Sequence, residues 1–158
     1  MSITFHSTAL FVRDIEVSKR FYTEVMEMKI ELDFNKNVIL NNGLTIWEIW
    51  QDHIIPDKME IDLKDISAKP RAELCYETED IFAVHKKLCD NNVEFLHELN
   101  EEPWGQLTVR FFDPDKHLLE VGESLATFVN RLHKEGRTPE QVSEKTSVPL
   151  EAVKQLIQ

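Results

Sequence analysis

The sequence of 158 residues predicts an α+β fold made of two consecutive βαβββ modules and a C-terminal helical extension. Two observations support the modules. The order strand, helix, three strands occurs twice along the chain, and the two predicted helix caps, Asp14 and Asp80, lie 66 positions apart. A third observation supports the extension, because the strand pattern gives way to helical spacing after Ser124.

The first module begins with a strand over residues 3–12, in which Leu10 and Val12 share one face. Asp14 then supplies the side-chain oxygen that begins a helix. The apolar positions of this helix recur every four residues, at Val17, Phe21 and Val25, with Ile15 and Tyr22 beside them. Three short strands follow, over 29–34, 36–41 and 44–50. The turn Asn41-Asn42-Gly43 joins the last two, since Asn and Gly tolerate positive φ.

The second module repeats this order from residue 71 onward. A strand over 71–79 precedes Asp80, the cap of a second helix. The buried face of that helix consists of Ile81, Val84, His85 and Leu88. Strands over 93–96, 106–112 and 116–122 complete the module, and Asp113-Pro114-Asp115-Lys116 predicts a turn between the last two. Residues 51–69 contain Pro56 and mixed charge and directly precede Pro70, which predicts a linker between the modules.

The extension, residues 124–158, carries apolar residues at helical spacing. Thr138 is a predicted N-cap with Pro139 at the first helical position, and Pro149 begins a further short helix. The same spacing is found in helix-turn-helix motifs, so a role in DNA binding has to be considered. The charge of residues 125–158 is only +1, however, which favours a helical hairpin packed on the domain or on a dimer partner.

Composition excludes several classes of protein. The net charge of −11 argues against a broad nucleic-acid surface and favours cationic ligands. No apolar run approaches the roughly 20 residues of a membrane helix. The N-terminus lacks the pattern of a secretory signal, so we expect a cytoplasmic protein. Cys75 and Cys89 form no CxxC pair, which predicts reduced thiols that serve as packing residues.

Three motifs accompany the repeated module: Asp14-Ile-x-x-Ser-x-x-Phe-Tyr22, Trp104-Gly105, and Asp113-Pro-Asp-Lys-His-Leu-Leu-Glu120. Together they resemble the vicinal oxygen chelate superfamily of glyoxalases, bleomycin-resistance proteins and dioxygenases. The resemblance covers residues 3–123, with module 1 over about 3–50 and module 2 over about 70–123. It implies that each module curls into a half-barrel and that paired modules enclose a cleft with a metal or ligand site. The chain departs from the family at Glu27 and Lys116, where glycine is frequent.

The resemblance also implies candidate site residues. Family metal ligands lie on the first and last strands of each module, which here correspond to Ser7, Glu48, Glu73 and Glu120. This set contains no histidine, so a metal at these positions is expected to be Mg²⁺ or Mn²⁺. Glu120 or Glu48 is then the candidate for moving a proton. The substrate pocket is expected to include Phe11, Ile46, Trp50 and Trp104, whereas strand parity places Trp47 outside the cleft.

Three functions remain open at this point. The first is a divalent-metal-dependent isomerase or lyase of glyoxalase type that acts on vicinal oxygens. The second is a non-catalytic protein that sequesters a ligand or drug, favoured because the hydroxyl of Ser7 is a poor ligand. The third is a vestigial cleft with a helical extension that makes a regulatory or oligomeric contact. In each case we expect a homodimer, a small-molecule ligand, and neither a membrane nor a nucleic acid as partner.

Overall fold

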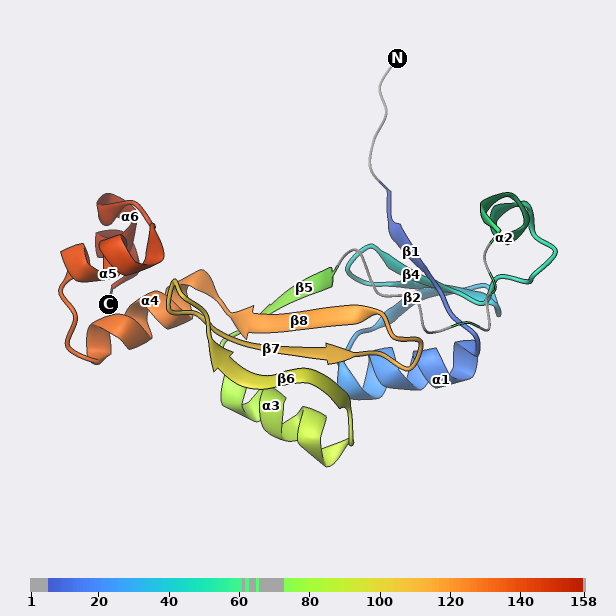
Figure 1. The fold of residues 1–158 in the computed structure, drawn as a ribbon, viewed down its shortest axis with the longest axis horizontal. Helices are drawn as coiled ribbons and strands as arrows, with labels where there is room; N and C mark the ends of the chain where they lie inside the picture. The colour runs from blue at the N-terminus through green and yellow to red at the C-terminus, as the bar shows by residue number, and fades with distance from the viewer. Residues whose placement is uncertain (1–5, 61, 63–64, 66–72, 158) are drawn as a thin grey trace, which may run out of the picture. The chain divides into compact units, whose positions relative to one another are not determined.

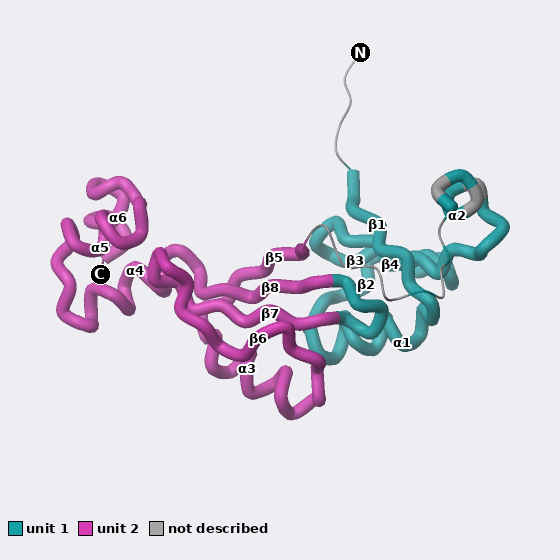
Figure 2. The backbone as a smooth tube through the Cα atoms, viewed as in Figure 1, with its two compact units in different colours: residues 1–71, 113–117 teal, residues 72–112, 118–158 magenta. Residues whose placement is uncertain are grey.

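The computed structural model describes residues 6–60, 62, 65 and 73–157, which form two compact units (Figures 1 and 2). Unit 1 comprises residues 1–71 and 113–117, and unit 2 comprises residues 72–112 and 118–158. Within the described ranges, no helix is both long and apolar enough to cross a membrane. The α+β class is confirmed, with a four-stranded mixed sheet and helices in each unit.

Unit 1 follows the predicted order of strand, helix and three strands. Its elements are β1 (Thr8–Phe11), α1 (Ile15–Arg20), η1 (Phe21–Val25), β2 (Ile30–Asp33), β3 (Asn37–Leu40), β4 (Leu44–Trp47) and α2 (Ile54–Met59). The strands lie in the order β1-β4-β3-β2, with β1 parallel to β4. The short helix α2 falls inside the predicted linker. The predicted strand residues 3–5 and 71–72, and most of residues 61–70, lie outside the described residues.

The first helix begins where the cap predicted it. The Asp14 carboxylate accepts hydrogen bonds from the backbone of Glu16 at 2.9 Å and of Val17 at 3.1 Å. Its last turn is a π-helix, in which the backbone N–H of Met26 donates to the carbonyl of Phe21 at 3.1 Å. The wider turn adds a residue to the helical repeat, so the adjacent Phe21 and Tyr22 are both buried.

The core of unit 1 lies between its sheet and this helix. Leu10 on β1 pairs with Ile46 on β4, and Ile46 pairs with Val38 on β3. All three side chains are buried, and Ile46 is fully so. Partners directly opposite on neighbouring strands point to the same face, so Ile46 belongs to the helix-covered core. The prediction that Ile46 lines the cleft is therefore wrong, because Ile46 was placed on the same face as Glu48 on the expectation that Glu48 points into the cleft.

Unit 2 repeats the same topology. Its elements are β5 (Glu73–Thr78), α3 (Ile81–Asp90), β6 (Glu94–Glu101), β7 (Leu107–Phe112) and β8 (Leu118–Glu123). The strand order is β5-β8-β7-β6, with β5 parallel to β8. Helix α3, capped by Asp80 as predicted, covers one face of this sheet (Figure 1). Strand β6 is longer than predicted, and its pairing with β7 shifts register twice, which marks bulges in this edge strand.

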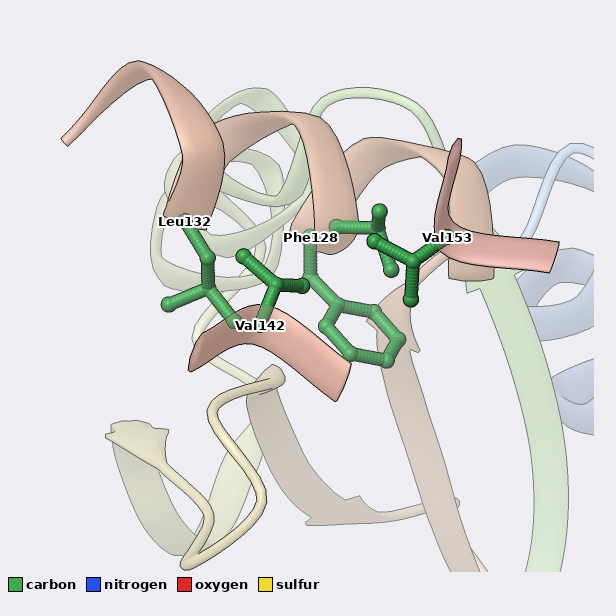
Figure 3. Packing of buried hydrophobic residues seen from close by; sticks show 5 residues of the cluster. Phe128, Leu132, Val142 and Val153 are labelled. Atoms are coloured by element: carbon green, nitrogen blue, oxygen red, sulfur yellow. The ribbon is translucent and has the colours of Figure 1, made fainter. Parts of the chain in front are cut away.

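Three helices follow β8: α4 (Leu125–Lys134), α5 (Pro139–Thr146) and α6 (Leu150–Leu156). Ser124 caps α4, and Thr138 forms a capping box with Gln141 at the start of α5. The helices enclose a small core of their own, in which Phe128, Leu132, Val142 and Val153 meet (Figure 3). The predicted helical extension is thus present as a packed cluster of three helices.

Candidate functional site

The second sheet has one face that points away from α3, and this open face carries two of the predicted site residues. Cys75 on β5 lies directly opposite Glu120 on β8, and Glu73 is two residues before Cys75 on the same face. Leu119 and Val121, which alternate with Glu120, are buried on the helix side. The predicted faces of β5 and β8 are therefore correct.

Arg110 on β7 joins the acidic side chains of this face. Its Nε donates to Glu73 Oε2 at 3.0 Å, and its Nη1 donates to Glu102 Oε1 at 2.6 Å. Its Nη2 forms an ion pair with Glu120 Oε2. His97 Nε2 lies 3.2 Å from Nη1, so one guanidinium contacts three carboxylates and an imidazole. We call these residues, with Cys75, the Arg110 cluster.

Burial and neighbouring charges set the protonation of the Arg110 cluster. Burial raises the pKa of Glu120, and the charges of Glu73 and Glu102 add to this against the opposing effect of Arg110. The hydrogen bond from Arg110 holds the pKa of Glu102 below its usual value. Burial also raises the pKa of the Cys75 thiol, reinforced by Glu73 and Glu120. The Oε2 atom of Glu120 is buried and is paired with Arg110 Nη2.

Glu48 lies in unit 1, on the face of the sheet that α1 covers. Its Oε2 accepts a hydrogen bond from the backbone N–H of Ile15 at 3.0 Å, and its Oε1 is 2.5 Å from Lys36 Nζ. The carboxylate thus supports the first turn of α1, on the helix-covered side of its sheet. The expectation that it points to the cleft face is wrong, because Glu48 has the same parity as the buried Ile46.

The repeat now identifies the true counterpart of Glu120. Cys75 pairs with Glu120 in unit 2, and the corresponding pair in unit 1 is Ala9 with Thr45. The position equivalent to Glu120 in unit 1 is therefore the buried Thr45 and not Glu48. Ser7, the other predicted ligand of this unit, is half-buried and directly precedes β1. The two modules are consequently unequal at this position, since unit 2 has a carboxylate where unit 1 has a threonine.

Unit 1 presents aromatic rings instead. Phe11 and Trp47 are neighbours in register, with ring centroids 5.9 Å apart. The ring centroids of Trp47 and Trp50 lie 6.5 Å apart, and those of Trp50 and His53 lie 4.9 Å apart, both pairs in edge-to-face geometry. Trp47 was expected outside the cleft, yet it shares the open face with Phe11. Whether Phe11 and Trp50 contribute to one pocket with residues of unit 2 stays a prediction.

Trp104 occupies the turn between β6 and β7. Its indole N–H donates to Gln106 Oε1 at 3.0 Å, and Gln106 in turn donates to the carbonyl of Glu123 at 2.8 Å. Trp104 is 41% exposed. These contacts hold the indole at the end of the hairpin, and its role in a substrate pocket stays a prediction.

A hollow of about 730 Å³ lies elsewhere in unit 2. It is lined by the start of α3, including Phe82, and by α4 and α6, including Thr127, Arg131, Lys134 and Leu156. None of the residues of the Arg110 cluster lines this hollow. It is therefore a separate feature of the surface and not the predicted cleft.

The Arg110 cluster can be tested against a divalent metal, which the fold family implies. Glu73, Cys75 and Glu120 each offer a ligand atom, and these atoms lie within 4.8 Å of one another. The guanidinium of Arg110, however, already forms ion pairs with both Glu73 and Glu120. A dication would add charge beside it, and like unit charges 4 Å apart repel by roughly 4 kcal/mol at an effective dielectric constant of 20. With Arg110 so placed, these residues do not fit a divalent metal.

Sequence reasoning missed Arg110 and Glu102. A signal for Arg110 was present, because it occupies a strand position between the apolar residues Val109 and Phe111, which predicts the opposite face. Glu102 lies just beyond β6, and only the bulged pairing of β6 with β7 brings it to Arg110. That pairing is not readable from the local sequence.

The class of protein follows from these observations. Two βαβββ modules, each with a parallel pair of first and last strands, define the vicinal oxygen chelate fold. Residues 5–126 match the model of the Glyoxalase-like domain family, and the chain belongs to that family. The helices α5 and α6 lie beyond the matched residues.

The chain is also similar to several known proteins. The chain is 28% identical over 124 residues to the uncharacterized protein YetH of Bacillus subtilis, covering 74% of this chain and 95% of YetH. A protein of unknown function from Agrobacterium tumefaciens is 33% identical with a TM-score of 0.69, over 79% of this chain and 97% of that one. A lactoylglutathione lyase from Agrobacterium tumefaciens shares the fold at 19% identity, with a TM-score of 0.57 over 77% and 93% of the two chains.

Proposed function

We propose that the protein binds a cationic small molecule at the Arg110 cluster and sequesters it without metal-dependent chemistry. The observation that carries this proposal is the contact of one guanidinium with three carboxylates. Arg110 and the carboxylates of Glu73, Glu102 and Glu120 together carry a net negative charge. Glu120 is the carboxylate of this set whose pKa burial raises, and it shares Arg110 with Glu73 and Glu102.

The chemistry of the site favours binding over turnover. Arg110 donates to Glu73 and Glu102, so its donors are already used and an anionic ligand would compete with these carboxylates. An ammonium or amidinium group would instead offer donors to Glu120. Such a ligand adds a hydrogen bond to a partly buried carboxylate, which is worth roughly 1.5–3 kcal/mol.

Calorimetry with matched probes tests this proposal. Benzamidine and phenylethylamine represent cationic ligands, and benzoate and benzyl alcohol are their anionic and neutral counterparts. We expect the cations to bind in preference to the counterparts and Glu120→Gln to weaken their binding. Glu144→Gln, an exposed position on α5, is the control and should leave binding unchanged. Equal affinity for all four probes, or an unchanged affinity in Glu120→Gln, would refute the proposal.

A metal-dependent isomerase or lyase is the second candidate. It is favoured by the convergence of ligand atoms from Glu73, Cys75 and Glu120, which would require Arg110 to leave. Titration with Mn²⁺ or Mg²⁺ distinguishes the two candidates. If Arg110 serves as the resident cation, neither ion should raise the melting temperature of the native protein. A rise that grows in Arg110→Met would favour the metal-dependent candidate.

Our proposal includes a homodimer in the cytoplasm, with neither membrane nor nucleic acid as partner. It assigns residues 3–123 to the glyoxalase-like domain and 124–158 to the helical extension. The net charge of −11 supports the absence of nucleic acid. Sedimentation of the full chain and of a chain ending at Ser124 tests the assembly. A monomeric full chain would refute the dimer, and an unchanged dimer in the shorter chain would exclude the extension as its contact.

A further inference from the structure

A second group of side chains with potential metal-ligand atoms lies on the opposite side of unit 2, between α3 and β6. His85 and Cys89 are four residues apart on α3, which places them on one face of the helix. Glu98 on β6 meets them there. The three ligand atoms lie within 4.8 Å of one another. Sequence reasoning treated His85 as a core residue and Cys89 as a packing residue, but Cys89 is exposed and His85 only half-buried.

The distance between the ligand atoms of Cys89 and His85 matches that of a zinc site. Cys89 Sγ lies 3.6 Å from His85 Nε2. Tetrahedral zinc, with bonds of about 2.3 Å to sulfur and about 2.0–2.1 Å to nitrogen, requires these two ligand atoms to be about 3.6 Å apart. The same imidazole nitrogen is hydrogen-bonded to Glu98 Oε2, so the carboxylate already faces the nitrogen that would bind the ion.

The scaffold explains why the three side chains converge. Helix α3 is fixed by its Asp80 cap and by the burial of Ile81 and Leu88 against the sheet. The ring of Phe95 packs against the His85 imidazole, with centroids 5.6 Å apart. The register shifts on either side of His97 turn β6, so that His97 faces Arg110 while the next residue, Glu98, faces α3.

We propose that His85, Cys89 and Glu98 form a surface site for Zn²⁺ or a similar borderline transition metal. The donor set of nitrogen, sulfur and oxygen favours zinc over Mg²⁺ and Mn²⁺, which prefer oxygen alone. Zinc replaces the direct bond between His85 and Glu98, and Cys89 binds as thiolate, with its proton released to water. Three protein ligands leave a fourth position for water or for another ligand. This site is independent of the proposed function, because it shares no residue with the Arg110 cluster.

Cobalt provides a direct test, since Co²⁺ bound to a thiolate absorbs in the near ultraviolet. We expect the full chain to bind a single Co²⁺ with this absorption and Zn²⁺ to displace it. Cys89→Ser should abolish the thiolate band, whereas Cys75→Ser, the matched control in the Arg110 cluster, should retain it. Glu98→Gln should lower the affinity by more than about tenfold, as loss of even an outer-shell partner can do. Absence of the band, or its loss in Cys75→Ser alone, would overturn the proposal.

Alkylation of the native chain gives an independent measurement, because both cysteines are exposed and the sequence contains no others. Zn²⁺ should slow the modification of Cys89 by iodoacetamide, measured by mass spectrometry, while Cys75 reacts at its original rate. Equal protection of both cysteines, or protection of Cys75 alone, would contradict a site at Cys89. Benzamidine binding to the Arg110 cluster does not affect the cobalt or alkylation result. The proposed zinc site and the proposed cation site can therefore be refuted independently.

Discussion

Arg110 and Glu120 lie directly opposite each other on the neighbouring strands β7 and β8, and their side chains form an ion pair on the open face of the sheet. This ion pair determines the electrostatics of the Arg110 cluster. The guanidinium occupies the position from which a metal ion would otherwise neutralise the carboxylates. Burial nevertheless outweighs this compensation at Glu120, whose pKa is raised.

The raised pKa of Glu120 predicts a pH dependence of stability. A carboxyl with a folded pKa above its ordinary value of 4.5 keeps its proton more readily in the native state. Its contribution is therefore fully present below that value and is lost as the pH rises through the folded pKa. We expect the free energy of unfolding of the native protein to fall over this window relative to Glu120→Gln. Urea titrations at several pH values measure the difference, and a constant difference would contradict the prediction.

Glu48 should show the opposite dependence. The hydrogen bond from Lys36, followed by that from the Ile15 backbone, lowers the pKa of Glu48. A depressed pKa contributes stability above the ordinary value, which is lost as the pH falls through the folded pKa. We expect Glu48→Gln to cost about 1 kcal/mol at neutral pH and almost nothing in acid. Its affinity for benzamidine should equal that of the native protein, since we assign Glu48 to the support of α1 and not to the ligand.

The ion pair between Glu123 and Arg131 should be the strongest single attachment of the helical extension. Glu123 is 2% exposed, and its oxygens accept from Arg131 at 2.9 and 2.8 Å. Arg131→Met leaves this carboxylate buried and uncompensated, so we expect a loss of about 3 kcal/mol in urea unfolding. The matched control is Arg137→Met, which removes an exposed pair with Glu135 and should cost under about 1 kcal/mol. Equal losses of unfolding free energy in the two variants would show that the Glu123–Arg131 ion pair contributes no more than an exposed pair.

Replacing Lys116 with glycine should relieve backbone strain in its turn. Its φ of 68° lies in the left-handed region, which costs an L-residue roughly 1–2 kcal/mol. Lys116→Gly and Lys116→Ala both lose the contacts of the lysine, but only glycine relieves the strain. We expect the glycine variant to be more stable than the alanine variant by about 1 kcal/mol in thermal unfolding. An alanine variant of equal or greater stability would show that the turn is unstrained.

The positive φ at Lys116, and that of 56° at Glu27, give a physical meaning to two departures from the family pattern. Both residues occupy positions where glycine is frequent in the family, and the backbone retains the conformation that favours glycine. The sequence pattern alone indicated the departure. Its cost depends on a backbone angle that only the structure supplies.

Local signals in the sequence were sufficient for most of the elements, although not for α2, and for one sheet face. The caps at Asp14 and Asp80 predicted both helix starts, because capping depends on residues within one turn. Alternation along β5 and β8 predicted that Glu73 and Glu120 share a face, because both residues lie inside uninterrupted strands.

Pairing between distant segments decided the rest. Alternation groups Glu48 with Ile46, but the pairing of β4 with β1 decides that both lie on the helix-covered face. The ion pairs of Arg110, and the opposite faces of His97 and Glu98, depend on the register of β6, β7 and β8. Strand register and bulges arise from contacts across the whole sheet, whereas periodicity reports only on neighbours along the chain. The amino-acid sequence by itself therefore determined which elements form, and the tertiary structure decided which charges meet.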